Sequence, residues 1–237
     1  MKLIELIRKL INPLHMDLVK YPDLDLRRRK KLLDYHQINK ILDVGANAGQ
    51  YASQVFELGF KGTIISFEPL SEVYNVLEGK AAKNDSWKTY NHALGSAKEE
   101  VEINVSQNTF SSSILDILPS HVNSAPASKY IKKEKISVEK LDDVFEKFYK
   151  EQDNILLKID VQGFEKQVLE GAIKSLDNIK GIQVEMSVEE LYKGEMLFNE
   201  MVNYLHSFGF TLHSLENGFY NEETGKLLQV DGIFFKS

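Results

Sequence analysis

The stretch KILDVGANAGQYASQ, residues 40–54, changes character at its middle. It begins as an apolar run with a single acidic residue, Asp43, and continues through Gly45 and Gly49 into a composition typical of a helix start. A buried strand that turns sharply into a helix is the repeating unit of α/β proteins. The turn between strand and helix is therefore the first candidate binding site.

Length and composition allow one large domain without disulfides. It has 237 residues, a hydrophobic content of 43% and a formal net charge of −6, which suffices for one large core. It contains no cysteine, so disulfides, thiolate metal sites and a cysteine nucleophile are excluded, and a cytoplasmic location is expected. The negative charge and the lack of an aromatic-rich basic motif argue against nucleic-acid binding.

The sequence predicts an N-terminal helical segment, residues 1–37, ahead of a main domain at 38–237. Apolar residues recur at helical spacing among positive charges at Leu3, Leu6, Ile7, Leu10, Ile11 and Leu14. No apolar run reaches the roughly 20 residues that span a bilayer. The first helix is expected to pack on its own domain or another subunit, with peripheral membrane contact as the alternative. The basic run LRRRKKLL, 26–33, favours a solvated helix face, with anionic lipid or a phosphate-bearing substrate as the alternative.

From residue 38 onward, short apolar runs alternate with helical patterns. We predict strands near 40–44, 63–68, 88–92, 155–160, 181–185, 211–215 and 231–235, and helices near 49–58, 71–82, 139–150, 165–176 and 197–208. This alternation predicts a mostly parallel sheet with helices on both faces. The last two strands are separated by turn-forming residues too few for a crossover helix, so we expect an antiparallel hairpin.

Three cofactors compete for the turn after the first strand, where open α/β sheets bind ligands. A mononucleotide phosphate loop needs Gly-Lys-Ser/Thr, which is absent, and a dinucleotide fingerprint needs glycine where Asn47 and Gln50 stand. S-adenosylmethionine carries no phosphate and requires polar groups around an amino-acid tail and a ribose. Asn47 suits the tail, and Glu68 at the end of the second strand suits a vicinal diol.

Seven segments, in order, resemble the FkbM family of S-adenosylmethionine-dependent methyltransferases. They are LDVGANAGQYA, SFEPL, NHALG, SSSIL, LKIDVQGFEKQVLEGA, VEMSVEELYKGE and GFYNEETGKLLQVDGIF. The resemblance runs from about residue 16 to the C-terminus. It implies a Rossmann-like class I methyltransferase fold, with a seven-stranded sheet and an antiparallel final strand. It also implies O-methylation, often of sugar hydroxyls in polysaccharides, glycolipids or natural products. DVQG departs from the DVEG common in the family, so no carboxylate role is assigned to Gln162.

The resemblance also implies which residues bind the cofactor. Those at the methionine and ribose end would be Asp43, Gly45, Ala46, Asn47 and Gly49. Glu68 would bind the ribose, Pro69 and Leu70 would flank the adenine, and His92 and Ala93 would lie at its edge. For His92, a role as the mere end of a strand is an equal alternative.

Methyl transfer to a sugar hydroxyl requires removal of a weakly acidic proton. Asp160, after the fourth of the main strands, is the first candidate for this base, and Glu185, after the fifth, is the second. If the two strands are neighbours, both carboxylates face one cavity, and their mutual repulsion raises one pKa. Asp160 could instead cap the following helix, or the pair could bind Mg²⁺ or Ca²⁺; no metal ligand is assigned.

Acceptor binding is expected from the least regular segments. Residues 109–130 are rich in serine and read as a long loop of the kind that forms lids or binding sites. Candidate substrate-binding residues are Ser111, Ser112, Ser113, Tyr192 and Asp231. The predicted function is S-adenosylmethionine-dependent O-methylation of a saccharide or glycoconjugate. Methylation of a non-sugar natural product and a non-catalytic scaffold role are the alternatives.

Overall fold

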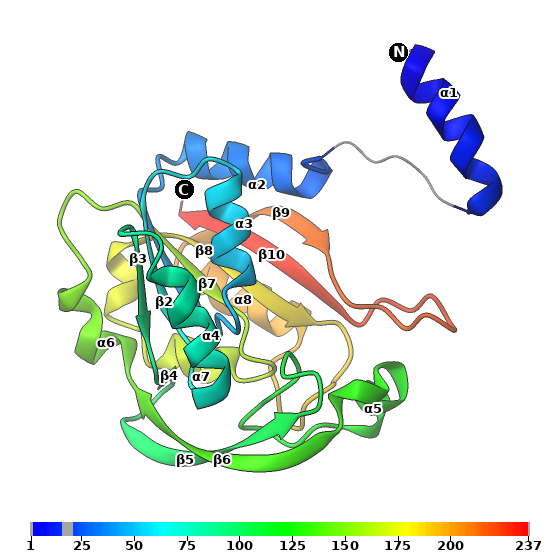
Figure 1. Cartoon of the computed structure of the whole chain (residues 1–237). Helices are drawn as coiled ribbons and strands as arrows, with labels where there is room; N and C mark the ends of the chain where they lie inside the picture. The colour runs from blue at the N-terminus through cyan, green and yellow to red at the C-terminus, as the bar shows by residue number, and fades with distance from the viewer. Residues whose placement is uncertain (1, 16–20, 237) are drawn as a thin grey trace.

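A seven-stranded mixed sheet forms the centre of the protein in the computed structural model, which describes residues 2–15 and 21–236 (Figure 1). Its strands are β1 (Lys40–Val44), β2 (Thr63–Phe67), β3 (Trp87–Tyr90), β7 (Ile155–Ile159), β8 (Ile179–Ser187), β9 (Phe210–Asn217) and β10 (Gln229–Lys236). The order is β3-β2-β1-β7-β8-β10-β9. Neighbours from β3 to β8 pair in parallel, whereas β10 pairs antiparallel with β8 and β9. The predicted parallel sheet with an antiparallel C-terminal hairpin is confirmed.

Helices cover both faces of this sheet. They are α2 (Leu24–Tyr35), α3 (Gln50–Glu57), α4 (Ser71–Ala81), α6 (Leu141–Val144), α7 (Glu165–Glu170) and α8 (Phe198–Ser207). Because successive strand residues point to opposite faces, Ile41 packs in a cluster with residues of α2, α3 and α4. Its neighbour Leu42 packs in another cluster with residues of α6, α7 and α8. Every residue of β1 and β7 is buried, as expected for central parallel strands.

A second, three-stranded sheet was not predicted. It consists of β4 (Ala93–Leu94), β5 (Glu99–Ser106) and β6 (Tyr130–Glu139) in the order β4-β6-β5. The sequence EEVEINVS is so rich in charge that it does not resemble a buried strand, yet Ile103 and Val105 alternate with polar residues. These side chains pack with Ile136 of β6 and with Leu70 and Val73 at the start of α4. The small sheet therefore packs against Leu70 and Val73, in the segment that follows β2.

Local structure within and after this sheet also differs from expectation. Part of the long serine-rich loop forms α5 (Pro119–Ser124) and the 3₁₀ turn η2 (Pro126–Ser128). The helix expected over 139–150 is only α6, followed by the 3₁₀ turn η3 (Phe145–Lys147), and the one expected over 165–176 ends at Glu170 before η4 (Ser175–Asn178). Short apolar spacing at 3.6-residue intervals fits such broken turns as well as a continuous helix.

The N-terminal residues form α1 (Lys2–Ile11), the turn η1 (Asn12–Leu14) and α2. Along α1 and η1 the apolar side chains of Ile4, Leu6, Leu10 and Leu14 are exposed. The basic run in α2 is not simply a solvated face, because Arg28 donates to the carbonyl of Leu215 and Arg29 pairs with Glu216, both in β9. Within residues 2–15 and 21–236, no helix has the length and apolar character to cross a membrane.

The contact between Gly171 and the end of β4 tests how the small sheet packs. A β-carbon at residue 171 would lie 1.9 Å from the carbonyl oxygen of Gly95, so Gly171→Ala must displace one backbone from the other. We expect the free energy of unfolding in urea to fall by about 1–3 kcal/mol. Gly79→Ala is the control, since its β-carbon meets nothing within 4 Å and helix propensity should raise stability by about 0.5–1 kcal/mol. Equal changes in the free energy of unfolding for Gly171→Ala and Gly79→Ala would contradict this packing.

Candidate active site

The turn between β1 and α3 lies directly against the end of β7. Gly45 has a φ of +75°, and a β-carbon there would lie 1.8 Å from the carbonyl oxygen of Asp160, so only glycine fits. The backbone amides of Gly45 and Ala46 both donate to the carbonyl of Phe67, at 3.1 and 3.0 Å. The turn is therefore tied to the ends of both neighbouring strands.

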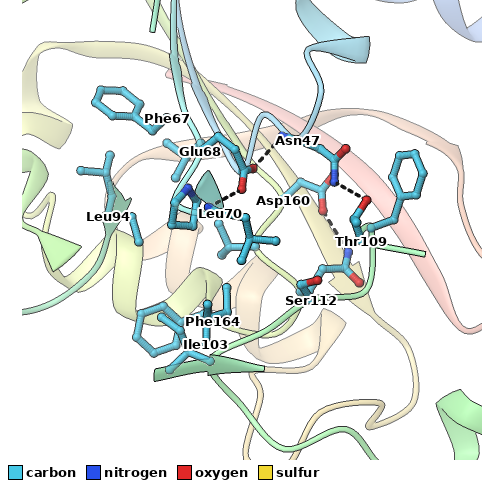
Figure 2. A pocket seen from close by; sticks show the side chains of 18 residues that line it. Asn47, Phe67, Glu68, Leu70, Leu94, Ile103, Thr109, Ser112, Asp160 and Phe164 are labelled. Atoms are coloured by element: carbon cyan, nitrogen blue, oxygen red, sulfur yellow. Dashed lines mark hydrogen bonds between the residues drawn. The ribbon is translucent and has the colours of Figure 1, made fainter. Parts of the chain in front are cut away.

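Glu68 follows β2 and is 5% exposed. Its carboxylate accepts backbone hydrogen bonds from Asn47 at 2.8 Å and Leu70 at 2.9 Å, as Figure 2 shows. Burial raises the pKa of Glu68 to about 7, although these two amides act in the opposite direction. Each oxygen retains a second lone pair for a ligand hydroxyl.

A pocket of about 670 Å³ opens beside Glu68, partly continuous with solvent. One part is apolar, with Leu70, Leu94, Ile103 and Phe164 among its lining residues, and the other contains Asn47, Thr109 and Asp160 (Figure 2). The apolar part can cover a flat ring, and the polar part can bind charged or hydroxyl groups.

Lys158 underlies the polar part. Its ammonium lies 3.2 Å from Asp43 and 3.5 Å from Asp160, and it donates to the carbonyl of Gly45 at 3.2 Å. Asp43 is fully buried and also accepts a hydrogen bond from Ser66 at 3.1 Å. One buried cation thus joins β1, the glycine turn and the carboxyl end of β7.

Gln162 holds the two candidate base residues together. Its amide nitrogen donates to Asp160 at 2.9 Å and to Glu185 at 2.6 Å. Its amide oxygen accepts from the hydroxyl of Tyr192 at 2.7 Å, which fixes the orientation of the amide. Gln162 has a φ of +57°, a conformation uncommon for residues other than glycine and one that concentrates at functional sites.

Two carboxylates with different environments result. The Asp160 side chain is 37% exposed and lines the pocket. An adjoining cavity contains Arg29, Gln183 and Asp231, and we call it the polar cavity. Glu185 lines neither the pocket nor the polar cavity. Burial, together with the charges of Asp160 and Asp231, raises the pKa of Glu185 well above its ordinary value, which favours its neutral form.

The structure brings some predicted site residues together and separates others. The pocket is lined by Gly45, Asn47, Glu68, Pro69, Leu70, Ala93, Ser112 and Asp160. Ala46 and Asp231 line an adjoining cavity. The others lie behind the lining or elsewhere: Asp43, Gly49, His92, Ser111, Ser113, Glu185 and Tyr192.

Each of these has an evident structural environment. His92 faces a separate cavity with Tyr90 and Lys98. Tyr192 is fully buried, so it has no free ring face for a sugar, and it acts on the site only through Gln162. Ser113 donates to the backbone carbonyl of Gln162 at 2.6 Å. Tyr192 and Ser113 therefore support the site through Gln162 without lining it.

Sequence reasoning did not identify the lining residues Ile103 and Phe164, and it included Thr109 and Phe110 only as part of the segment 109–130. Ile103 belongs to the unpredicted β5, and the period-two alternation of that strand was the available signal. Among the residues that the structure describes, no three His, Cys, Asp or Glu side chains converge to bind a metal ion.

Comparison with known proteins places the fold in a class. A structure assigned as an S-adenosylmethionine-dependent methyltransferase from Listeria monocytogenes is 10% identical, with 89% of this chain and 97% of that chain covered and a TM-score of 0.51. A second Listeria monocytogenes protein, uncharacterised, has 8% identity, 89% and 67% coverage and a TM-score of 0.50. Magnesium protoporphyrin IX methyltransferase from Synechocystis has 7% identity, 90% and 80% coverage and a TM-score of 0.47. The fold is that of class I Rossmann-like methyltransferases.

The family is shown by sequence. The family model of the methyltransferase FkbM domain matches residues 43–212, which is more than half of the chain, and the protein belongs to this family. It is an S-adenosylmethionine-dependent methyltransferase. A search of curated proteins found no match.

The pocket fits S-adenosylmethionine. Glu68 is buried and still has lone pairs for both hydroxyls of a ribose. The apolar part beside it, with Leu94 and Phe164, suits an adenine ring. The turn lacks a β-carbon at Gly45, so backbone and ligand can come close where Asn47 and Asp160 supply polar groups.

We expect cofactor binding to depend on pH through Glu68. Its pKa of about 7 means that it is largely protonated at pH 6, whereas a diol is best bound by the ionised carboxylate, so binding releases a proton. The Kd for S-adenosylhomocysteine should fall by up to about tenfold from about pH 6 to about pH 8 and then level off. Titration calorimetry in buffers of different ionisation enthalpy measures both effects. Glu68→Gln should bind weakly with a flat profile, and a flat wild-type profile would contradict this role.

Proposed function

We propose that this methyltransferase acts on a hydroxyl group of a saccharide or glycoconjugate and that Asp160 accepts the hydroxyl proton. The observation that supports the proposal is the position of Asp160. It is the one carboxylate among the described residues that lines both the cofactor pocket and the polar cavity beside it. A base at this boundary can contact an acceptor while the cofactor is bound.

When bound beside Glu68 and Asn47, the cofactor would supply an electrophilic methyl group from its sulfonium centre, leaving neutral S-adenosylhomocysteine after transfer. Asp160 would accept the proton that the acceptor hydroxyl loses as its oxygen takes the methyl group. Alignment of acceptor and donor provides much of the rate in such a displacement. The carboxylate removes a proton that would otherwise oppose the reaction.

The surroundings of Asp160 suit this role better than those of Glu185. Gln162 and Lys158 orient the Asp160 carboxylate while part of it stays exposed to the pocket. Glu185 faces neither cavity, and its raised pKa favours the neutral form. A neutral Glu185 also avoids placing a second negative charge next to the base.

An acceptor panel tests the substrate class. The protein is incubated with methyl-labelled S-adenosylmethionine and with glycosides, sugar phosphates, uronic acids, phenols and hydroxy acids. We expect label in an alkali-stable methyl ether of a carbohydrate, because a hydroxyl and not a carboxyl group is methylated. Label only in a non-sugar product would contradict the saccharide assignment. Binding of S-adenosylhomocysteine with no turnover of any acceptor would favour a scaffold role.

Replacing Asp160 tests the base. Asp160→Asn keeps the size of the side chain and removes its ability to accept a proton. We expect kcat to fall by about 10²–10⁴-fold, while the Kd for S-adenosylhomocysteine stays within about twofold of wild type. Asp85→Asn, at an exposed position outside both cavities, is the control and should have wild-type kcat. A fully active Asp160→Asn enzyme would remove Asp160 from its proposed role.

A further inference from the structure

A second cavity adjoins the cofactor pocket on the side of α2 and α3. This is the polar cavity, with a volume of about 660 Å³ that is partly open to solvent. Its lining residues are Arg29, Gly45, Ala46, Asn47, Gln50, Tyr51, Gln54, Phe110, Lys158, Asp160, Gln183 and Asp231. It shares Gly45, Asn47, Phe110 and Asp160 with the cofactor pocket. A molecule in the polar cavity therefore lies directly next to the cofactor site.

Both cations that line the polar cavity are already paired within the protein. The Arg29 guanidinium forms an ion pair with Glu216 and donates to Gln54 at 2.9 Å. Lys158 pairs with Asp43 and Asp160. The Arg29 and Lys158 side chains are only 11% and 6% exposed. Neither cation is left to neutralise a phosphate or carboxylate of a ligand.

Unlike the two cations, the Asp231 carboxylate has no hydrogen-bond partner among the described residues, although it lines the cavity at the start of β10. Burial, then the charges of Asp160 and Glu216, raises its pKa to about 6. An anionic ligand group would meet Asp160 and Asp231 without a compensating cation, which is unfavourable at short range. A ligand hydroxyl would find a free acceptor.

Hydrogen-bond donors are also available. The side-chain oxygen of Gln183 accepts from the hydroxyl of Tyr51 at 2.9 Å, and that of Gln54 accepts from Arg29. These bonds fix both amides, and no hydrogen bond within the described residues uses either amide nitrogen. The exposed ring of Phe110, 59% accessible, lies at the boundary with the cofactor pocket. Fixed acceptors, fixed donors and one aromatic ring match a hydroxylated sugar ring.

We propose that the polar cavity binds the acceptor as an uncharged, hydroxyl-rich sugar ring, with Asp231 and Gln183 hydrogen-bonding its hydroxyls beside Asp160. This inference rests on the proposed function and narrows it, because it excludes a sugar acid or sugar phosphate from the ring that enters the cavity. Charged parts of a larger glycoconjugate would remain outside.

Ligand-observed NMR on the full-length protein saturated with S-adenosylhomocysteine tests the inference. The probes are methyl glycosides of glucose, mannose, galactose and rhamnose, compared with methyl glucuronide and glucose 6-phosphate. We expect binding of at least one neutral glycoside and none of the two anions. Binding of an anion as strong as that of the neutral sugars would overturn the inference, and so would the absence of any neutral binding.

Variants locate the binding. Asp231→Asn and Gln183→Leu should each raise the Kd for the neutral glycoside by about tenfold. The Kd for S-adenosylhomocysteine should stay within about twofold of wild type. Asp85→Asn is the matched control and should bind like wild type, and circular dichroism checks folding. Weakened S-adenosylhomocysteine binding in both variants would assign the cavity to the cofactor tail and overturn the inference.

The outcomes for the two proposals are distinguishable. Binding of neutral glycosides without their methylation contradicts the proposed function and leaves the character of the cavity supported. Methylation of an anionic sugar whose neutral counterpart does not bind supports saccharide methylation and overturns the inference on charge.

Discussion

The buried ammonium of Lys158 is the interaction on which the site depends. An unpaired charge inside a protein is strongly unfavourable, and breaking a buried pair leaves such a charge behind. Burial opposes the ammonium charge, but Asp43 and Asp160 outweigh it and the pKa of Lys158 lies above its ordinary value. The same ammonium donates to the carbonyl of Gly45. The partners of a single charge thus fix the relative positions of β1, its glycine turn and the end of β7.

Around this charge the protein gives three carboxyl groups different properties. Asp160 is oriented by Gln162 and remains partly exposed. Glu185 is half-buried, hydrogen-bonded to Gln162 and Gln229, and shifted towards its neutral form. Asp231 faces the polar cavity without a hydrogen-bond partner among the described residues. A glutamine between Asp160 and Glu185 supplies donors to both, whereas a third carboxylate there would add repulsion.

The two cavities are enclosed by parts of the chain that are distant in sequence. The small sheet and the segment at Thr109 and Phe110 close the cofactor pocket on one side. On the other side α2 brings Arg29 over α3, where its ion pair with Glu216 in β9 anchors the helix to the sheet edge. The N-terminal helix α2 therefore contributes to the region next to the cofactor, and the basic run within it has a structural role.

The mostly parallel sheet, the antiparallel hairpin and the candidate cofactor turn could be predicted from local patterns. Apolar runs of five residues, turn glycines and a carboxylate after a strand are readable because they reflect backbone geometry and short-range chemistry at positions such as Gly45 and Glu68. The order of the motifs was sufficient to recognise the family. What depended on local pattern alone could therefore be predicted, and the cofactor turn belongs to this group.

Other features became evident only in three dimensions. Strand β5 was missed because its solvent-facing charges hide the alternation of Ile103 and Val105. The apolar face of this strand is evident only once it packs against Leu70, the residue before α4. Tyr192, expected to contact a sugar, is buried and binds Gln162 instead. Which side chains are buried and which ion pairs form depend on segments that are distant in sequence. Burial and ion pairing in turn decide whether a cation is free to bind a ligand and whether a carboxylate is neutral. The amino-acid sequence thus predicted the cofactor and a mostly parallel sheet with an antiparallel hairpin. Tertiary packing decided the order of the strands and which polar groups face a ligand.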